Sequence, residues 1–267
     1  MRDIVENPEA WSAVAADYDE TVRQKLGFFS AAAVDWLGLA EDDVVLDVAC
    51  GPGTTTELVA PRVRRVHAVD FAPRMIEMLR ANLRDRDNVT TEVGDGQKLT
   101  LHDETFTVAV SMFGLMFFAD TRAGLRELHR VLRPGGRALI SSWVPMAQSP
   151  MMKPLGEALM TAIGPRPDAE PPAPFAFEDE GQLVAGLTEA GFVDVQVRRV
   201  APELEVGSAD AYWADTRGNV VVRHMQQMAG SHWPTIEAKA LAHLRATLEG
   251  VQTLEMPGLL ALGRKPA

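Results

Sequence analysis

The 267-residue sequence is poor in cysteine, in basic residues and in aromatic side chains. Its single cysteine, Cys50, excludes an internal disulfide bond and any zinc site built from several cysteines. The 26 Lys and Arg are outnumbered by 37 Asp and Glu, which gives a formal net charge of −11. Because such a charge repels a phosphate backbone, we expect no general binding of nucleic acid.

Long hydrophobic runs are also absent. No apolar stretch approaches the roughly 20 residues that span a bilayer, so we expect no membrane span. Residues 1–11 carry Asp3, Glu6 and Glu9 and no apolar segment, unlike a signal peptide. These features predict a soluble, cytoplasmic protein without a bound metal, and they leave its oligomeric state open.

From about residue 44 onward, short β-branched runs alternate with helical patterns. Between the second and third runs, Ile76, Leu79 and Leu83 recur at the spacing of one helix face. Strands separated by helices indicate βαβ units with right-handed crossovers, and hence a parallel sheet. The predicted strands are residues 44–48, 66–69, 89–93, 106–111 and 138–143.

The pattern changes after Trp143. Residues 145–177 are rich in Pro and Met, and a following helix ends at Gly191. Residues 208–249 look helical, and the last strand is predicted at 254–262. We therefore predict one domain with these parts: an N-terminal helical cap (1–40), a core (41–144), an insertion (145–177), a helix and strand (178–207), a helical lid insertion (208–250) and a last strand (251–267).

A glycine-rich turn follows the first predicted strand, with the sequence DVACGPG at 47–53. Glycine lets a ligand approach the backbone without meeting a Cβ atom. N–H groups at a helix start favour a negative group such as a carboxylate. The turn therefore predicts a ligand-binding loop, although a tight turn that binds nothing would have the same features.

Acidic residues follow the next two predicted strands. Asp70 lies 17 residues beyond Gly53, where an acid in a doubly wound sheet accepts hydrogen bonds from ribose hydroxyls. It could equally be a solvated carboxylate or the N-cap of a helix at Pro73. Asp95 could accept from an adenine amino group, or lie in a Gly-Asp-Gly surface turn. Both acids are expected at the carboxyl edge of the sheet, where such folds bind ligands.

Four ordered segments resemble class I S-adenosylmethionine-dependent methyltransferases, of the ubiquinone/menaquinone-biosynthesis type and its small-molecule relatives. They are VLDVACGPG at 45–53, VDFAPRM at 69–75, GDG at 94–96 and LHRVLRPGG at 128–136, and SMFGL at 111–115 is also similar. The resemblance implies a Rossmann-like, doubly wound α/β fold with helical lid insertions. Its seven-stranded, mostly parallel sheet would have an antiparallel last strand, 254–262, beside residues 193–200.

The same resemblance implies that the core binds S-adenosylmethionine and yields S-adenosylhomocysteine. Asp47, Gly51 and Gly53 would cradle the methionine part of the cofactor, and Asp70 would bind the ribose. Ser111 and Met112 would approach the donor sulfur, and Tyr18 would close over the cofactor. The full implied set is Tyr18, Asp47, Gly51, Gly53, Asp70, Phe71, Met75, Asp95, Gly96, Gln97, Ser111 and Met112, with Asp95, Gly96 and Gln97 holding the adenine.

The acceptor side is less specific. His224 and His232 are candidate general bases, because a phenol or amine acceptor must lose a proton. They could instead be structural, and an acidic acceptor such as an enol would need no base. Candidate pocket walls, which could equally pack a core, are Trp11, Phe113, Met116, Phe117, Trp143, Tyr212 and Trp213.

We therefore expect an enzyme that methylates a small, largely apolar organic molecule by in-line displacement, mainly through proximity and desolvation. The alternative is a non-catalytic S-adenosylmethionine-binding module that regulates a partner protein. A nicotinamide-dependent reductase is disfavoured, because the turn at 51–56 lacks the third glycine of G-x-G-x-x-G.

Overall fold

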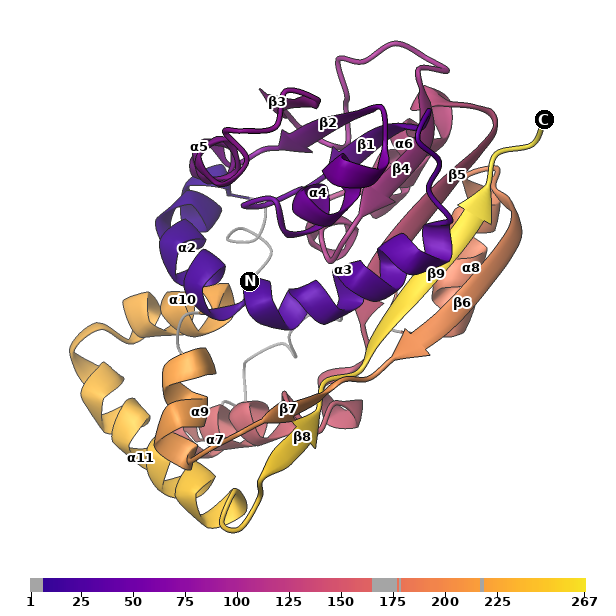
Figure 1. The fold of residues 1–267 in the computed structure, drawn as a ribbon. Helices are drawn as coiled ribbons and strands as arrows, with labels where there is room; N and C mark the ends of the chain where they lie inside the picture. The colour runs from indigo at the N-terminus through magenta and orange to yellow at the C-terminus, as the bar shows by residue number, and fades with distance from the viewer. Residues whose placement is uncertain (1–6, 165–176, 178, 217–218) are drawn as a thin grey trace.

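The computed structural model describes residues 7–164, 177, 179–216 and 219–267. A seven-stranded sheet forms its centre, in the order β3-β2-β1-β4-β5-β9-β6 (Figure 1). Only β9 runs antiparallel to its neighbours, so the expected doubly wound, mostly parallel architecture is confirmed. The strands are β1 (Val44–Val48), β2 (Arg65–Asp70), β3 (Val89–Val93), β4 (Phe106–Ser111), β5 (Leu132–Trp143), β6 (Val193–Val200) and β9 (Gly258–Arg264).

The centre of the sheet is buried on both faces. All five residues of β1 are buried, and β-branched side chains fill this strand and β4, as expected for strands covered by helices on either side. From β1 the chain builds outward to β2 and β3, then returns to add β4 and β5 on the other side. This reversal opens a crevice at the carboxyl ends of β1 and β4, where doubly wound folds bind ligands.

Helices cover both faces of the sheet. On one face, Ala33, Val34 and Leu37 of α3 pack with Val59 of α4 against the strands. On the other face, the buried leucines of α6 and α8 do the same, Leu125 among them. The flanking helices are α3 (Arg23–Leu37), α4 (Thr54–Val59), η1 (Ala60–Arg62), α5 (Pro73–Asn82), η2 (Leu115–Phe117), α6 (Thr121–Val131) and α8 (Glu180–Glu189).

A second helical layer lies beyond the carboxyl ends of the parallel strands (Figure 1). It encloses its own apolar cluster, which includes Tyr212, Trp213 and Trp233. The N-terminal helix α2 (Pro8–Thr21) lies between α5 and the α10 helix of this layer (Figure 1). The layer comprises η3 (Met146–Gln148), α7 (Lys153–Ile163), α9 (Ala209–Thr216), α10 (Val220–Ala229), η4 (Gly230–His232) and α11 (Trp233–Thr247).

Two predicted boundaries are corrected. Strand β5 begins at Leu132, directly after α6, instead of at residue 138. The predicted last strand is divided into β8 (Thr253–Glu255) and β9, because Pro257 lies between them and cannot donate a ladder hydrogen bond. Strand β8 pairs with β7 (Glu203–Glu205) in a two-stranded sheet that the sequence pattern did not indicate. The predicted pairing of the last strand with residues 193–200 is confirmed.

The insertion predicted at 145–177 contains η3 and α7, and its residues 165–176 lie outside the described part of the chain. Within the described residues, no helix is both long and apolar enough to cross a bilayer.

Candidate active site

A cavity of about 350 Å³ lies at the carboxyl edge of the sheet, within the size range of small-molecule sites. Helix α2 covers it, and the loops after four successive parallel strands form its floor. The lining comprises Pro8, Trp11 and Tyr18 from α2, Ala49 and Gly51 after β1, Asp70, Phe71 and Met75 after β2, Gly94, Asp95, Gly96 and Gln97 after β3, and Met112, Phe113, Gly114, Phe117, Phe118 and Ala119 after β4.

The cavity floor contains backbone in the left-handed region. Gly51 has φ +55°, and the non-glycine residues Ala49 and Phe113 have φ +57° and +55°. Residues with a Cβ atom adopt this conformation rarely and at an energetic cost, which proteins tend to keep at functional sites. The sequence offered no signal for either strained position.

Asp70 lies at the edge of the cavity and is 6% exposed. Its Oδ2 accepts the N–H of Gly51 and its Oδ1 accepts the N–H of Ala72, both at 2.9 Å. Burial raises the pKa of this carboxyl to about 6. Asp70 is therefore neither solvated nor the N-cap of α5, which is Ala72. Its remaining lone pairs can accept hydrogen bonds from a ligand.

Asp47 lies beneath the glycine loop and does not line the cavity. It is 1% exposed, and its Oδ2 accepts the hydroxyl of Thr56 at 2.6 Å. Burial raises the pKa of the Asp47 carboxyl to about 7. Gly53 is also outside the lining, because it packs against Leu79, which a Cβ atom on the glycine would approach to 3.0 Å. Both residues help to fix the shape of the loop.

The loop after β3 is held by side chains that bond within it. Oδ1 of Asp95 accepts the backbone N–H and the side-chain amide of Gln97, at 2.9 and 3.0 Å. Oε1 of Gln97 accepts the N–H of Asp120 at 2.7 Å. A Cβ atom on Gly96 would lie 2.6 Å from the Phe118 ring and from Val48, so this position accepts only glycine without rearrangement.

The loops after β1 and β4 approach each other closely at Gly114, a contact that the sequence pattern did not indicate. A Cβ atom there would lie 2.3 Å from the Cβ of Ala49 and 3.1 Å from Oγ of Ser111. Ser111 is fully buried beneath the lining, and its hydroxyl has no hydrogen-bond partner among the described residues. The N–H of Phe113 donates to Oγ of Ser141 at 2.7 Å, which holds the β4 loop against β5.

One side of the cavity is aromatic. The ring of Trp11 lies edge-on to Phe117 and to Tyr18, with centroids 5.0 and 6.1 Å apart. Burial, with the charge of Asp70, raises the pKa of Tyr18 above its ordinary value, so its hydroxyl stays protonated at neutral pH. Phe113 stacks on Trp143 with a 3.8 Å centroid distance. Trp143 thus supports the wall from behind without lining it.

Comparisons with known proteins identify the family of this chain. A family model described as a methyltransferase domain matches residues 45–136. A demethylmenaquinone methyltransferase from Streptomyces griseus is 32% identical over 180 residues, which cover 64% of this chain and 76% of the relative. The chain belongs to the class I S-adenosylmethionine-dependent methyltransferases.

The fold of the methyltransferase is also found in solved structures. The YcgJ protein from Bacillus subtilis has a TM-score of 0.63 at 18% identity, and the match covers 89% of this chain and 98% of that protein. Phosphoethanolamine N-methyltransferase 2 from Haemonchus contortus, solved with phosphomonomethylethanolamine and S-adenosylhomocysteine, has a TM-score of 0.56 at 15% identity. That match covers 89% of this chain and 52% of the other. At these identities the likeness shows the fold alone.

Two predicted wall residues of the methyltransferase pack the helical layer instead of the cavity. Tyr212 is buried and its hydroxyl donates to the carbonyl of Met151. Trp213 is also buried, and its Nε1 donates to Glu237 at 2.8 Å. Their alternative interpretation as core residues is therefore the one that fits. Met116 is buried behind the lining, where its sulfur accepts the hydroxyl of Ser142.

The two histidines predicted as bases also lie outside the lining of the methyltransferase cavity. His224 is half-buried on α10, and burial lowers its pKa below the ordinary value. His232 is exposed at the end of η4. The structure brings neither of them to the aromatic wall.

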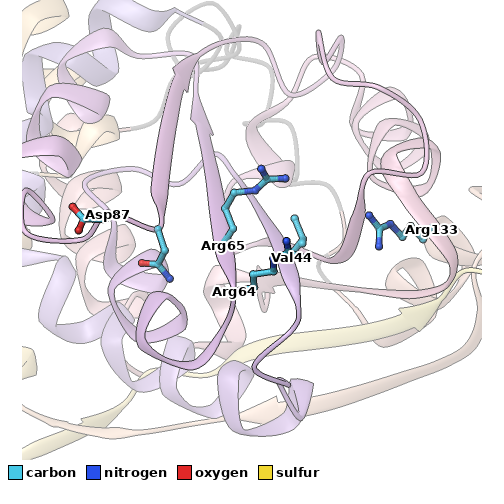
Figure 2. Close-up of a pocket in the computed structure, with 6 residues that line it drawn as sticks. Val44, Arg64, Arg65, Asp87 and Arg133 are labelled. Atoms are coloured by element: carbon cyan, nitrogen blue, oxygen red, sulfur yellow. The ribbon is translucent and has the colours of Figure 1, made fainter.

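A separate concavity of about 550 Å³ lies at the opposite edge of the sheet (Figure 2). Its lining residues lie near the amino ends of strands, so it is at the other edge of the sheet from the cavity that Asp70 lines. Asn88 is tied to the backbone there, since its Nδ2 donates to the carbonyls of Ala60 and Val63. The lining comprises Val44, Arg64, Arg65, Asp87, Asn88 and Arg133.

Proposed function

We propose that this chain binds S-adenosylmethionine in the carboxyl-edge cavity and transfers its methyl group to a small, largely apolar organic acceptor. The observation that carries the proposal is the buried carboxyl of Asp70, held at the cavity by two backbone N–H groups. A buried carboxyl is stabilised by hydrogen bonds, and Asp70 keeps lone pairs beyond those that accept from Gly51 and Ala72. Two ribose hydroxyls, which are hydrogen-bond donors, can donate to those lone pairs.

Other residues fit the remaining parts of the cofactor. The loop after β3, with Asp95 and Gln97 locked together, offers polar groups to the adenine. Gly51 and Met112 line the part of the cavity suited to the methionine part, and the buried hydroxyl of Ser111 lies beneath the lining there. Tyr18 covers the cavity from α2. In this proposal Asp47 and Gly53 act indirectly, by shaping the loop that holds the ligand.

S-adenosylmethionine supplies an electrophilic methyl group on a sulfonium. The residues of this chain align the acceptor with that methyl group and exclude water. Such alignment can contribute roughly 7–11 kcal/mol to a displacement reaction. Trp11, Phe113 and Phe117 form an apolar wall that excludes water. The loss of positive charge from the sulfonium sulfur during transfer is favoured beside such a wall relative to water.

No base is assigned in this mechanism. Among the described lining residues the titratable side chains are Tyr18, Asp70 and Asp95, of which the tyrosine stays protonated. His224 and His232 lie outside the lining, so we propose no catalytic part for them. An acceptor that ionises on its own, such as an enol, a phenol or a quinol, suits this wall. The Streptomyces griseus relative is named for a demethylmenaquinone acceptor.

We also propose that the whole chain acts as one domain, in the cytoplasm, on a small molecule and not on nucleic acid. The net charge of −11 supports the last point.

The proposal is tested in two steps. Calorimetry with S-adenosylhomocysteine should show one binding site, and S-adenosylmethionine should then be consumed with some member of a panel of phenols, amines and quinols. Failure to bind S-adenosylhomocysteine would overturn the cofactor assignment. Binding without turnover across the panel would favour the alternative, a regulatory S-adenosylmethionine-binding module.

A further inference from the structure

We propose that Asn82 is a positioning residue that latches the covering helix α2 to the glycine loop of the cofactor site. This inference rests on the proposed function. Nδ2 of Asn82, at the end of α5, donates to the carbonyl of Pro52 at 3.0 Å and to Oδ1 of Asp19 at 3.5 Å. Pro52 follows Gly51 of the cavity floor, and Asp19 follows Tyr18 of the cavity cover. One amide group therefore joins the two sides of the cleft.

The latch extends beyond Asn82 to two further helices. Oδ1 of Asp19 also accepts from Arg23 at 3.2 Å, and the other nitrogen of that guanidinium contacts Glu57. The chain of contacts thus links α5, α2, α3 and α4, the last of which begins directly after Gly53. All of these partners lie outside the cavity lining, so none of them touches the ligand.

Helix α2 is held over the cavity by packing against α5, α3 and α10. An apolar contact joins Ala15 to Ala72 and Met75. The helix ends at Val22, which is at once the C-cap of α2 and the N-cap of α3. A change of direction at this joint would move Trp11 and Tyr18 relative to the cavity floor. The polar latch opposes such a movement at Asp19, next to Tyr18 in the sequence.

The position of the latch predicts which part of a ligand loses binding affinity when the latch is removed. Pro52 belongs to the loop proposed to hold the methionine part, whereas Asp70 and Asp95 belong to other loops. Loss of the latch should weaken the binding of S-adenosylhomocysteine more than the binding of methylthioadenosine. Methylthioadenosine has the nucleoside but not the amino-acid part. A general loss of structure would weaken both ligands alike.

The test compares substitutions at one position on the full chain. In Asn82→Ala the Kd for S-adenosylhomocysteine should rise about 5- to 10-fold, as expected for one hydrogen-bonded group. The Kd for methylthioadenosine should change less than about 2-fold, and amide exchange over residues 8–21 should accelerate. Asn82→Asp keeps nearly the same side-chain shape but places a carboxylate against that of Asp19. It should therefore raise the Kd for S-adenosylhomocysteine more than Asn82→Ala does. A role in packing alone predicts the reverse order.

Matched controls separate the latch from its surroundings. Arg80→Ala changes the same helix but removes only a bond to Thr91, and it should leave both Kd values unchanged. Asp19→Ala should weaken the binding of S-adenosylhomocysteine more in the wild type than in Asn82→Ala, because the contact between the two residues is already lost in Asn82→Ala. The latch is refuted if Asn82→Ala behaves like Arg80→Ala, or if both ligands weaken equally. If the wild type binds neither ligand, the proposed function itself fails.

Discussion

The N–H of Gly51 donates to the carboxyl of Asp70 across 2.9 Å, which ties the glycine loop after β1 to the end of β2. The same carboxyl accepts the N–H of Ala72 with its other oxygen. The residue proposed to bind the ribose thus also shapes the loop proposed to bind the methionine part. Four expected outcomes follow from this site and its buried acids.

Asp70→Asn should weaken S-adenosylhomocysteine about 10- to 100-fold, since hydrogen bonds to a charged group are each worth about 1.5–3 kcal/mol. Both oxygens of Asp70 face N–H donors, so an amide must place its NH₂ group against one of them. Calorimetry measures the change. Asp85→Asn, at a carboxyl with 90% of its side chain exposed, is the control and should bind like the wild type. Unchanged affinity in Asp70→Asn would contradict the ribose assignment.

The affinity for S-adenosylhomocysteine should fall as the pH is lowered from 7 to 5. Burial raises the pKa of Asp70 to about 6 in the free protein, and ribose hydroxyls bind better to the ionised carboxyl. Binding near pH 6 should therefore release a proton, and calorimetry in buffers of different ionisation enthalpy detects this. The pH dependence should flatten in Asp70→Asn. A wild-type affinity that is constant between pH 5 and 7 would exclude this linkage.

The stability of the cofactor-free protein should respond to pH through Asp47. Its pKa is about 7 in the folded protein, above the ordinary value of 3.8 for Asp. The folded state therefore binds more protons than the unfolded state between about pH 4 and 7, and the contribution of this group to stability is lost as pH rises through that window.

Asp47→Asn removes this titration and can still accept the Thr56 hydroxyl. Its melting temperature relative to the wild type should rise between pH 5 and 8. A difference that stays constant with pH would show that Asp47 does not titrate in this range.

Gly96→Ala should lower the free energy of unfolding by about 1–3 kcal/mol, the usual cost of overpacking. The new methyl group would meet Phe118 and Val48 at 2.6 Å, and the turn of Asp95 and Gln97 would move with it. Gly27→Ala is the matched control, because a Cβ atom there meets nothing within 4 Å on helix α3. That change should raise stability by about 0.5–1 kcal/mol. Urea denaturation measures both, and a neutral Gly96→Ala would show that Phe118 moves freely.

The local pattern of residue types along the chain was sufficient to predict the strands and loops that form the site. Strands β1, β3 and β4 were predicted with their observed limits, since β-branched runs bounded by turn residues are local features. Alternation of strand and helix then placed Gly51, Asp70 and Asp95 at one edge, because parallel strands share a direction. All three line the cavity.

Aromatic side chains show where local pattern was insufficient. Tyr212 and Trp213 are aromatic residues like Trp11 and Phe117, and all four were predicted to line the pocket. Only Trp11 and Phe117 line the cavity. The difference lies in which helix face meets which partner, and that depends on residues far apart in the chain. Phe118, which closes on Gly96, was missed for the same reason.

The amino-acid sequence by itself determined the order of strands and helices, the glycine loop and the acids after successive strands, because these depend on neighbours in the chain. Only the tertiary structure decided that Asp47 is buried under Thr56, that His224 and His232 lie away from the cavity, and that Asn82 joins Pro52 to Asp19. These outcomes depend on distances between residues from 9 to 63 positions apart. Such distances are set by packing of whole elements, which periodicity and spacing do not encode.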